Sequence, residues 1–193
     1  MAGIQIDGVN NKIDFDDDLD TSISANTDDT LVIEAGGNTM ATITATTLTI
    51  NDGTTITTAD NTDNLTLKST DTDANIGPNL RLYRAVAGAA SDAIGTIDWA
   101  AQDVAGNLQD YASAAVTITD ATDGSEDATL TLKVMNAGSL NQMLTISGPE
   151  TVVNEGSKDH DFRVESNGNA NMLMVNGGND RVGVGTASPA TAL

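Results

Sequence analysis

Short runs in which apolar and polar residues alternate recur along almost the whole chain. In the first third they occupy 3–6, 12–15, 30–34, 40–44, 47–50, 55–58 and 65–68. Alternation with a period of two places the apolar side chains on one face of a strand, and Val, Ile and Thr dominate these runs. Asn, Asp and Gly separate the runs, as in Asn51-Asp52-Gly53, and they suit tight hairpin turns. The pattern predicts a series of short strands.

The middle of the chain has the same pattern in longer runs, which predict strands at 80–83, 94–99, 115–119, 129–134 and 142–146. The spacing of Val104, Leu108 and Tyr111 would also fit a helix, but Gly106 would lie in its first turn, where glycine is costly. We therefore predict a hairpin that turns at Gly106-Asn107, and a surface loop at 85–93.

Near the C-terminus, alternating runs at 161–166, 171–175 and 181–185 are separated by Asn-Gly turns. Neither helix caps nor a 3.6-residue period is present here, so the pattern predicts a stack of hairpins.

The large and basic side chains gather in the middle of the chain. Trp99, both tyrosines and four of the eight basic residues lie between 64 and 148; the basic ones are Lys68, Arg81, Arg84 and Lys133. We therefore expect three parts: a repetitive N-terminal β region at 1–63, which would serve as an anchor or shaft, a central β-domain at 64–148, and a C-terminal β-hairpin stalk at 149–193.

The composition predicts a thin core. Hydrophobic residues make up 39% of the chain and aromatic residues only 3%, and aromatics normally contribute much of a core's buried area. Disorder is one interpretation of such a composition. A disordered acidic chain, however, has no reason to alternate apolar and polar residues. The sequence therefore favours an ordered all-β fold that completes its core with other subunits.

The charge balance excludes several classes of partner. The chain has 28 acidic and 8 basic residues, a formal net charge of -20, which disfavours binding to nucleic acid or to anionic membranes. There are no cysteines for disulfides or thiolate metal sites. No apolar stretch is long enough for membrane insertion, and Met1–Gln5 is not followed by a signal-like apolar run. We expect assembly in a cytoplasm.

Candidate catalytic chemistry is weak. His160 is the only histidine, so one chain cannot build a histidine-based triad or a multi-histidine zinc site, and its polar surroundings at 157–161 predict a solvated loop. A pair of carboxylates could serve glycoside hydrolysis, but sugar sites usually use aromatic platforms, which are scarce here. We predict no enzyme, no catalytic residues and no cofactor.

Candidate metal sites are also poor. Asp71–Asn75 resembles the first half of a calcium loop, but Ile76 stands where glycine is expected and Leu82 where the final glutamate is expected. Two acidic runs are interpreted as solvated turns, although calcium binding there stays an open alternative: Asp14, Asp16, Asp17, Asp18 and Asp20, and Asp120, Asp123, Glu126 and Asp127. Gly183-Val184-Gly185 is no nucleotide-binding motif because no helix is expected after it.

The end of the chain is its most specific signal. Residues 179–193, NDRVGVGTASPATAL, resemble the VGIGT-x-SP-x-x-x-L element of bacteriophage tail-fibre proteins, with Val184 in place of the commoner isoleucine. The segments at 161–166 and 174–178 resemble the module that often carries this element. Residues 6–13, and the stretch from 65–71 through 120–127, are similar to parts of phage fibre proteins, especially those of marine phages.

The resemblance implies a structural protein of a virion, assembled in the host cytoplasm. Such proteins are elongated, intertwined homotrimers that bind other virion proteins of tail or capsid and contribute to host attachment. Their terminal element often precedes a self-cleaving intramolecular chaperone; whether one was removed after Leu193 or was never present stays open. A non-viral extracellular adhesin or filament subunit and a polysaccharide-degrading tailspike are the alternatives.

A host-surface receptor is a further expected partner. Arg and aromatic residues are enriched at interface hot spots, so the hypothesis places receptor contact on central loops such as 85–93. The alternative interpretation is that Trp99, Tyr83 and Tyr111 fill the core of the central domain, and for Trp99 we favour this alternative.

Overall fold

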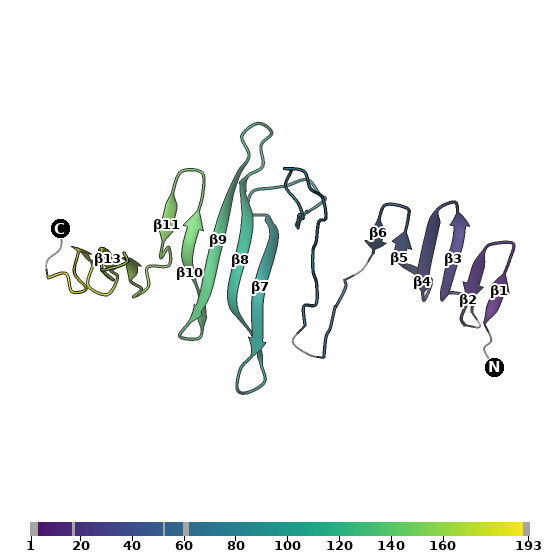
Figure 1. Ribbon diagram of the computed structural model, residues 1–193, viewed down its shortest axis with the longest axis horizontal. Helices are drawn as coiled ribbons and strands as arrows, with labels where there is room; N and C mark the ends of the chain where they lie inside the picture. Colours follow the sequence, from purple (N-terminus) through teal and green to yellow (C-terminus); the bar gives the residue numbers. More distant parts are fainter. Residues whose placement is uncertain (1–3, 17, 52, 60–61, 191–193) are drawn as a thin grey trace. The chain divides into compact units, whose positions relative to one another are not determined.

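The structure, a computed structural model, describes residues 4–16, 18–51, 53–59 and 62–190 (Figure 1). The described residues form strands and turns and contain no helix, so none of them could cross a membrane as an apolar helix. The strands make three antiparallel sheets of six, five and three strands. The chain divides into two compact units, Met1–Asn79 and Leu80–Leu193. The predicted all-β fold is confirmed.

The N-terminal sheet is a meander in which every strand pairs with the next one along the chain. Short polar turns make this possible: in the first, the Asp7 carboxylate accepts hydrogen bonds from the backbone N–H groups of Val9 (2.9 Å) and Asn10 (3.2 Å). The strands are β1 (Gln5–Asp7), β2 (Lys12–Asp14), β3 (Ser22–Thr27), β4 (Thr30–Ala35), β5 (Asn38–Ile43) and β6 (Leu48–Ile50).

The segment that follows β6 was expected to contain three more strands, at 55–58, 65–68 and 80–83. The described residues between Asn51 and Asp92 form none, so these three predictions are wrong for the single chain. A strand exists only through backbone hydrogen bonds to a neighbouring strand. In this segment, side chains make some of the hydrogen bonds that a neighbouring strand would otherwise make. The Asn64 side-chain amide donates to the Ile56 carbonyl and accepts from the Thr58 hydroxyl, both at 2.8 Å.

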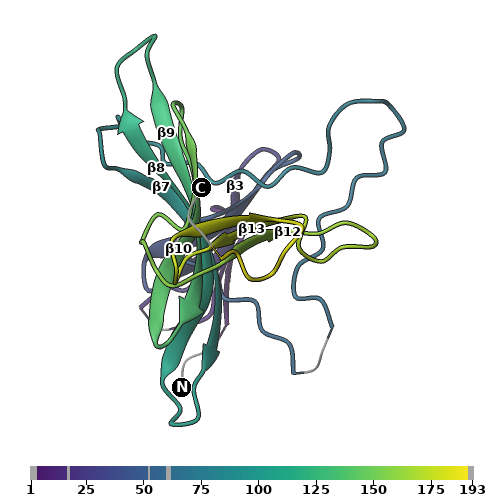
Figure 2. The same ribbon diagram turned by 90° about the vertical axis from the view of Figure 1, so that its left-hand side faces the viewer.

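The central sheet has the longest strands, in the order β11-β10-β9-β8-β7. They overlap in one narrow, twisted band when the sheet is seen along its hydrogen-bonding direction (Figure 2). The members are β7 (Ala93–Gln102), β8 (Leu108–Asp120), β9 (Asp127–Asn136), β10 (Ser139–Ile146) and β11 (Thr151–Val153). The predicted strands at 94–99, 115–119, 129–134 and 142–146 are confirmed.

The hairpin predicted at Gly106-Asn107 is also confirmed, and the helical alternative is wrong. The Asp103 carboxylate closes the turn by accepting hydrogen bonds from the N–H groups of Ala105 (2.8 Å) and Asn107 (2.9 Å). These bonds lower the pKa of Asp103, with the backbone bond from Asn107 as the largest cause. Gly106 has a φ of +85°, which favours glycine at this position.

The C-terminal sheet confirms the three runs predicted there. Its strands are β12 (Phe162–Val164), β13 (Leu173–Asn176) and β14 (Arg181–Val184), paired in the order β12-β13-β14. Two strands elsewhere, β3 and β11, were not predicted.

The glycines of the terminal element have distinct structural reasons. Gly185 has a φ of +73°. Gly183 faces the chain that folds back after β14: a Cβ at this position would lie 3.0 Å from the Thr186 carbonyl oxygen and 3.3 Å from Pro189 Cβ. Arg181 fixes the same segment by donating to the Pro189 carbonyl at 3.3 Å. The element therefore packs against one face of its own sheet.

We expect Gly183→Ala to destabilise the C-terminal sheet by about 1–3 kcal/mol, because the added methyl group forces backbone away from the strand. The matched control is Gly168→Ala, since a Cβ there meets nothing within 4 Å. The control should change stability by less than about 0.5 kcal/mol. Thermal unfolding of the two variants checks this; equal midpoints would contradict the packing described for the terminal element.

Candidate interaction surface

One row of side chains runs across the whole N-terminal sheet. The strand register places Ile6 opposite Ile13, Ile13 opposite Ile23, and Ile23 opposite Ile33. Residues that face one another across antiparallel strands project from the same side of the sheet. The row continues through β5 and β6, and we call it the isoleucine ladder: Ile6, Ile13, Ile23, Ile33, Ala41 and Ile50.

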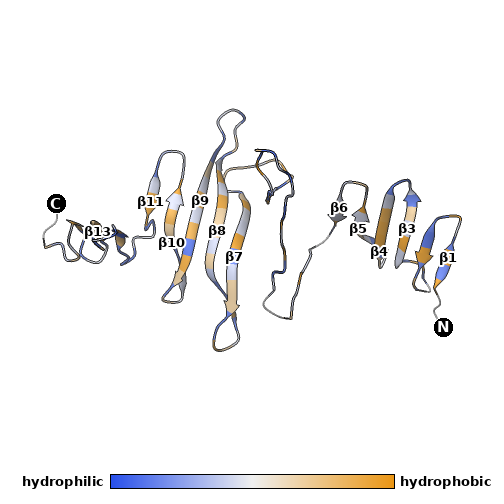
Figure 3. Cartoon of the chain, in the orientation of Figure 1, coloured by the Kyte–Doolittle hydropathy of each residue, from blue (hydrophilic) through white to orange (hydrophobic). Residues whose placement is uncertain are grey.

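Much of the isoleucine ladder is not covered by other described residues: Ile13 and Ile50 are exposed, and Ile23 and Ile33 are half-buried. A second, shorter row on the same face joins Leu31, Ile43 and Leu48. Ile6 is 79% exposed and Leu48 63%. Figure 3 shows apolar residues recurring from strand to strand in the sheets. A contiguous apolar surface of this kind on a soluble protein marks an interaction site.

The opposite face of the N-terminal sheet carries the charges. The six strands contain four charged residues, and each is adjacent in sequence to a ladder residue. Successive side chains of a strand project from opposite faces, so all four lie on this face: Asp7, Lys12, Asp14 and Glu34. The Lys12 ammonium lies 2.7 Å from Asp14 Oδ1 and donates to the Leu19 carbonyl at 2.9 Å.

This charged face is the better buried one. Ser22 donates to Glu34 Oε2 at 3.0 Å, and Ser22 and Asp14 are only 1% and 4% exposed. The unit thus buries polar side chains of this sheet among its own residues and leaves the apolar face the more exposed of the two. A protein that works alone has the reverse arrangement.

The central sheet repeats this separation. One row of apolar residues crosses all five strands: Ile97, Ala114, Leu132, Leu144 and Val153. Two shorter rows flank it on the same face. One joins Trp99, Ala112 and Val134, and the other joins Val116, Leu130 and Ile146. The charged residues Asp98 and Lys133 share a row on the other face with Ser113 and Gln142. Ile97, Leu132 and Val153 are exposed.

The C-terminal sheet does the same on a smaller scale. One face consists of two apolar rows: Phe162, Val175 and Val182, and Val164, Leu173 and Val184. Arg163 and Met174 share the other face, against which the terminal element packs. Met174, 8% exposed, is the only buried hydrophobic side chain among the described residues. Within a single described chain there is therefore almost no apolar core.

The aromatic side chains do not form the expected central core. Trp99 is 56% exposed and Tyr83 78%, so the expectation that they fill such a core is wrong for the single chain. The reason is the single-layer architecture: Trp99 projects from the apolar face of the central sheet, and the described strands of the same unit form no second layer over it. The surface loop predicted at 85–93 is found over 85–92, with Gly88 against the Ile118 side chain, whereas Ala93 already belongs to β7.

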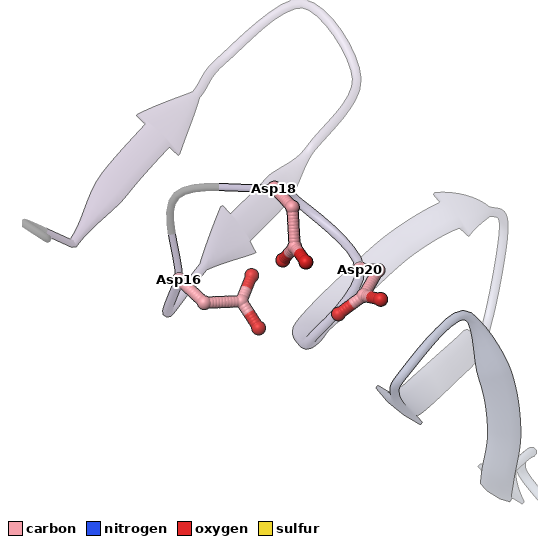
Figure 4. A group of neighbouring side chains, drawn as sticks. All are labelled: Asp16, Asp18 and Asp20. Atoms are coloured by element: carbon pink, nitrogen blue, oxygen red, sulfur yellow. The ribbon is translucent and has the colours of Figure 1, made fainter.

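The first acidic run brings three carboxylates together. Asp16, Asp18 and Asp20 each place an oxygen within 4.8 Å of the others, in the loop between β2 and β3 (Figure 4). Asp14, from the same run, instead pairs with Lys12, and Asp17 lies outside the described residues. Hydrogen bonds within the loop hold the group, among them Thr21 N–H to Asp16 Oδ1 at 3.3 Å. Oxygen ligands of this type suit Ca²⁺.

The three carboxylates have unequal electrostatic environments. The Thr21 hydroxyl, the largest cause, lowers the pKa of Asp16 by hydrogen bonding to its charged form. Desolvation raises the pKa of Asp20, and repulsion from Asp18 and Asp16 raises it further. The shared loop therefore stabilises the charge of Asp16 and disfavours that of Asp20.

The other sequence candidates form no comparable group of carboxylates among the described residues, although Asp120 and Asp127 lie opposite one another on β8 and β9. Asp71 and Asp73 bond to backbone N–H groups two residues ahead, in an exposed pair of turns. Asp120 likewise accepts from Thr122, whose side chain is the largest cause of the lowered pKa of Asp120. His160 is half-buried in the loop before β12, where its backbone lies against Gly177. Sequence reasoning identified all of these but missed the isoleucine ladder.

Comparison of the chain with protein-family models, with curated proteins and with solved structures found no match.

We expect Asp20→Asn to stabilise the N-terminal sheet at neutral pH. The folded-state pKa of Asp20 lies above the ordinary value of 3.8, so its ionisation opposes folding. Protonation of Asp20 relieves this opposition as the pH falls through the raised pKa.

Asp16→Ala should destabilise the N-terminal sheet at neutral pH. The folded-state pKa of Asp16 is lowered, so its ionised carboxylate contributes stability, which is lost as the pH falls through that lowered pKa.

Thermal unfolding between pH 7 and pH 3 measures both effects, which should shrink in acid. Asp28→Asn, in the turn between β3 and β4, removes the same charge elsewhere and serves as the control. An equal gain in this control would attribute the stabilisation to net charge and contradict the role of the local carboxylate repulsion.

Proposed function

We propose that the chain is a structural subunit of a bacteriophage virion, a fibre or surface appendage that works as a homotrimer and contributes to host attachment. The observation that supports this most is the shared construction of the three sheets. Each is a single layer with one neutral apolar face and with charged side chains on the other face. Such faces need a partner over much of the chain's length, which is what a fibre of parallel subunits offers.

The partner that fits the extended contact is another copy of the same chain. A cyclic homo-oligomer supplies each sheet with matching apolar faces at the same level along the assembly. It also shields the open edges that β1 and β6, and β7 and β11, leave at the ends of their sheets. The three-fold number comes from the resemblance of the terminal element to phage fibres.

The role is structural and not catalytic. Among the described residues the one group of carboxylates that gathers is Asp16, Asp18 and Asp20, on a loop, and no histidine lies in it. Host attachment would use surfaces left free by assembly, such as the loop at 85–92 and the tips of the central hairpins. Other virion proteins, of tail or capsid, would hold one end of the fibre.

Two other functions remain to be distinguished. A non-viral adhesin or filament subunit would also need uncovered sheets; antibodies raised against the chain would then label a cell surface and not purified virions. A polysaccharide-degrading tailspike would release new reducing ends from capsule or lipopolysaccharide, and one Asp or Glu substitution would abolish the release. The scarcity of aromatic platforms, 3% of the chain, disfavours the tailspike.

We expect sedimentation at low micromolar concentration to show a single species of three chains. The physical reason is that thin single-layer sheets bury too little apolar area, at about 25 cal/mol per Å², to offset an ordering cost of about 1.5 kcal/mol per residue. Trp99, the only tryptophan, should then emit at shorter wavelength in the trimer than in the unfolded chain. A cooperatively melting, well-folded monomer would refute the proposal.

A further inference from the structure

We infer that the isoleucine ladder is an interface between copies of this chain: in the assembled fibre, the ladder of the N-terminal sheet packs against the same ladder of the second and third copies, and the face of Lys12 and Glu34 takes no part in the contact. The inference rests on the proposed homo-oligomeric function and adds to it the face, the residues and the kind of contact. The occupant is this chain itself.

Charge favours a second copy on this face. Each chain has a net charge of -20, so a contact between two copies is least unfavourable where it brings no carboxylates together. The ladder face satisfies that condition, because Asp7, Lys12, Asp14 and Glu34 all project from the other side. The opposite face would bring Asp7 and Glu34 of one copy toward those of another.

Composition of the ladder also fits a contact with itself. Its members are five isoleucines and one alanine, without a donor or acceptor that a contact with an identical row would leave unsatisfied. Identical rows around a symmetry axis meet like with like. A different protein would have to provide a separate matching face for each of the three sheets.

The area of the ladder limits what it can do alone. At the usual spacing of about 4.8 Å, six strands span about 24 Å, so the face is smaller than the roughly 800 Å² that each partner contributes to a standard interface. The apolar faces of the central and C-terminal sheets would add to it. Loss of the ladder contact would therefore open the N-terminal sheet locally without separating the chains, and the test has to be local.

The absence of cysteine from the sequence makes such a test simple. Thr49 and Ile50 are neighbours on β6, both exposed in the single chain and projecting from opposite faces. Gln5 and Ile6 form an equivalent pair on β1 at the other edge of the sheet. Single substitutions Ile50→Cys, Thr49→Cys, Ile6→Cys and Gln5→Cys introduce one thiol each, and its rate of reaction with a maleimide is measured in the native full chain.

Thiols introduced at Ile50 and Ile6 should react at least about tenfold more slowly than those at Thr49 and Gln5, and the difference should vanish in denaturant. Equal rates, or slower reaction at Thr49 and Gln5, in a protein that sediments as three chains would overturn the inference and leave the proposed function intact. Sedimentation of the unmodified protein as a folded monomer would overturn the proposed function itself.

Discussion

The apolar face of a one-layer sheet has to be covered, and this constraint governs the rest of the molecule. A stable domain places a second layer on such a face. Here the three sheets each have an apolar face, yet the described strands pair only within their own sheets. The chain covers the polar side of its N-terminal sheet instead, around Asp14 and Ser22. In the proposed assembly, other copies of the chain supply the covering layers.

Turns and strand periodicity could be predicted from the sequence because they are local. The Gly106-Asn107 turn and most of the strands depend on residues that are near neighbours in the chain. The segments at 55–58, 65–68 and 80–83 have the same alternation and form no strand. Alternation gives a segment the capacity to pair, but whether a neighbour is present depends on the tertiary or quaternary structure. Strand β3, with the sequence SISANT, was missed because Ile23 is its only large apolar residue.

The isoleucine ladder could not be found by reading the sequence alone, although all its members lie in the pattern. A row across a sheet exists only at one register, and a slip by one residue would move a strand's apolar side chains to the other face. Register in turn depends on turn lengths and bulges, such as the shift between Ile33 and Glu34. One signal was available: each strand of the N-terminal sheet except β3 was predicted with apolar residues at alternate positions, so a meander in register would align them.

The acidic composition and the apolar faces have a common physical explanation. A chain with three uncovered sheets risks indiscriminate association through open edges and sticky faces. Charges confined to one face, as Asp7, Lys12, Asp14 and Glu34 are, forbid contacts through that side and leave the ladder as the only neutral surface of the sheet. The scarcity of aromatic residues agrees with this arrangement, because isoleucine and alanine present a narrow, even surface that identical copies can approach closely. In the proposed assembly, the same charge that keeps copies apart in most orientations would thus select the orientation in which their apolar faces meet.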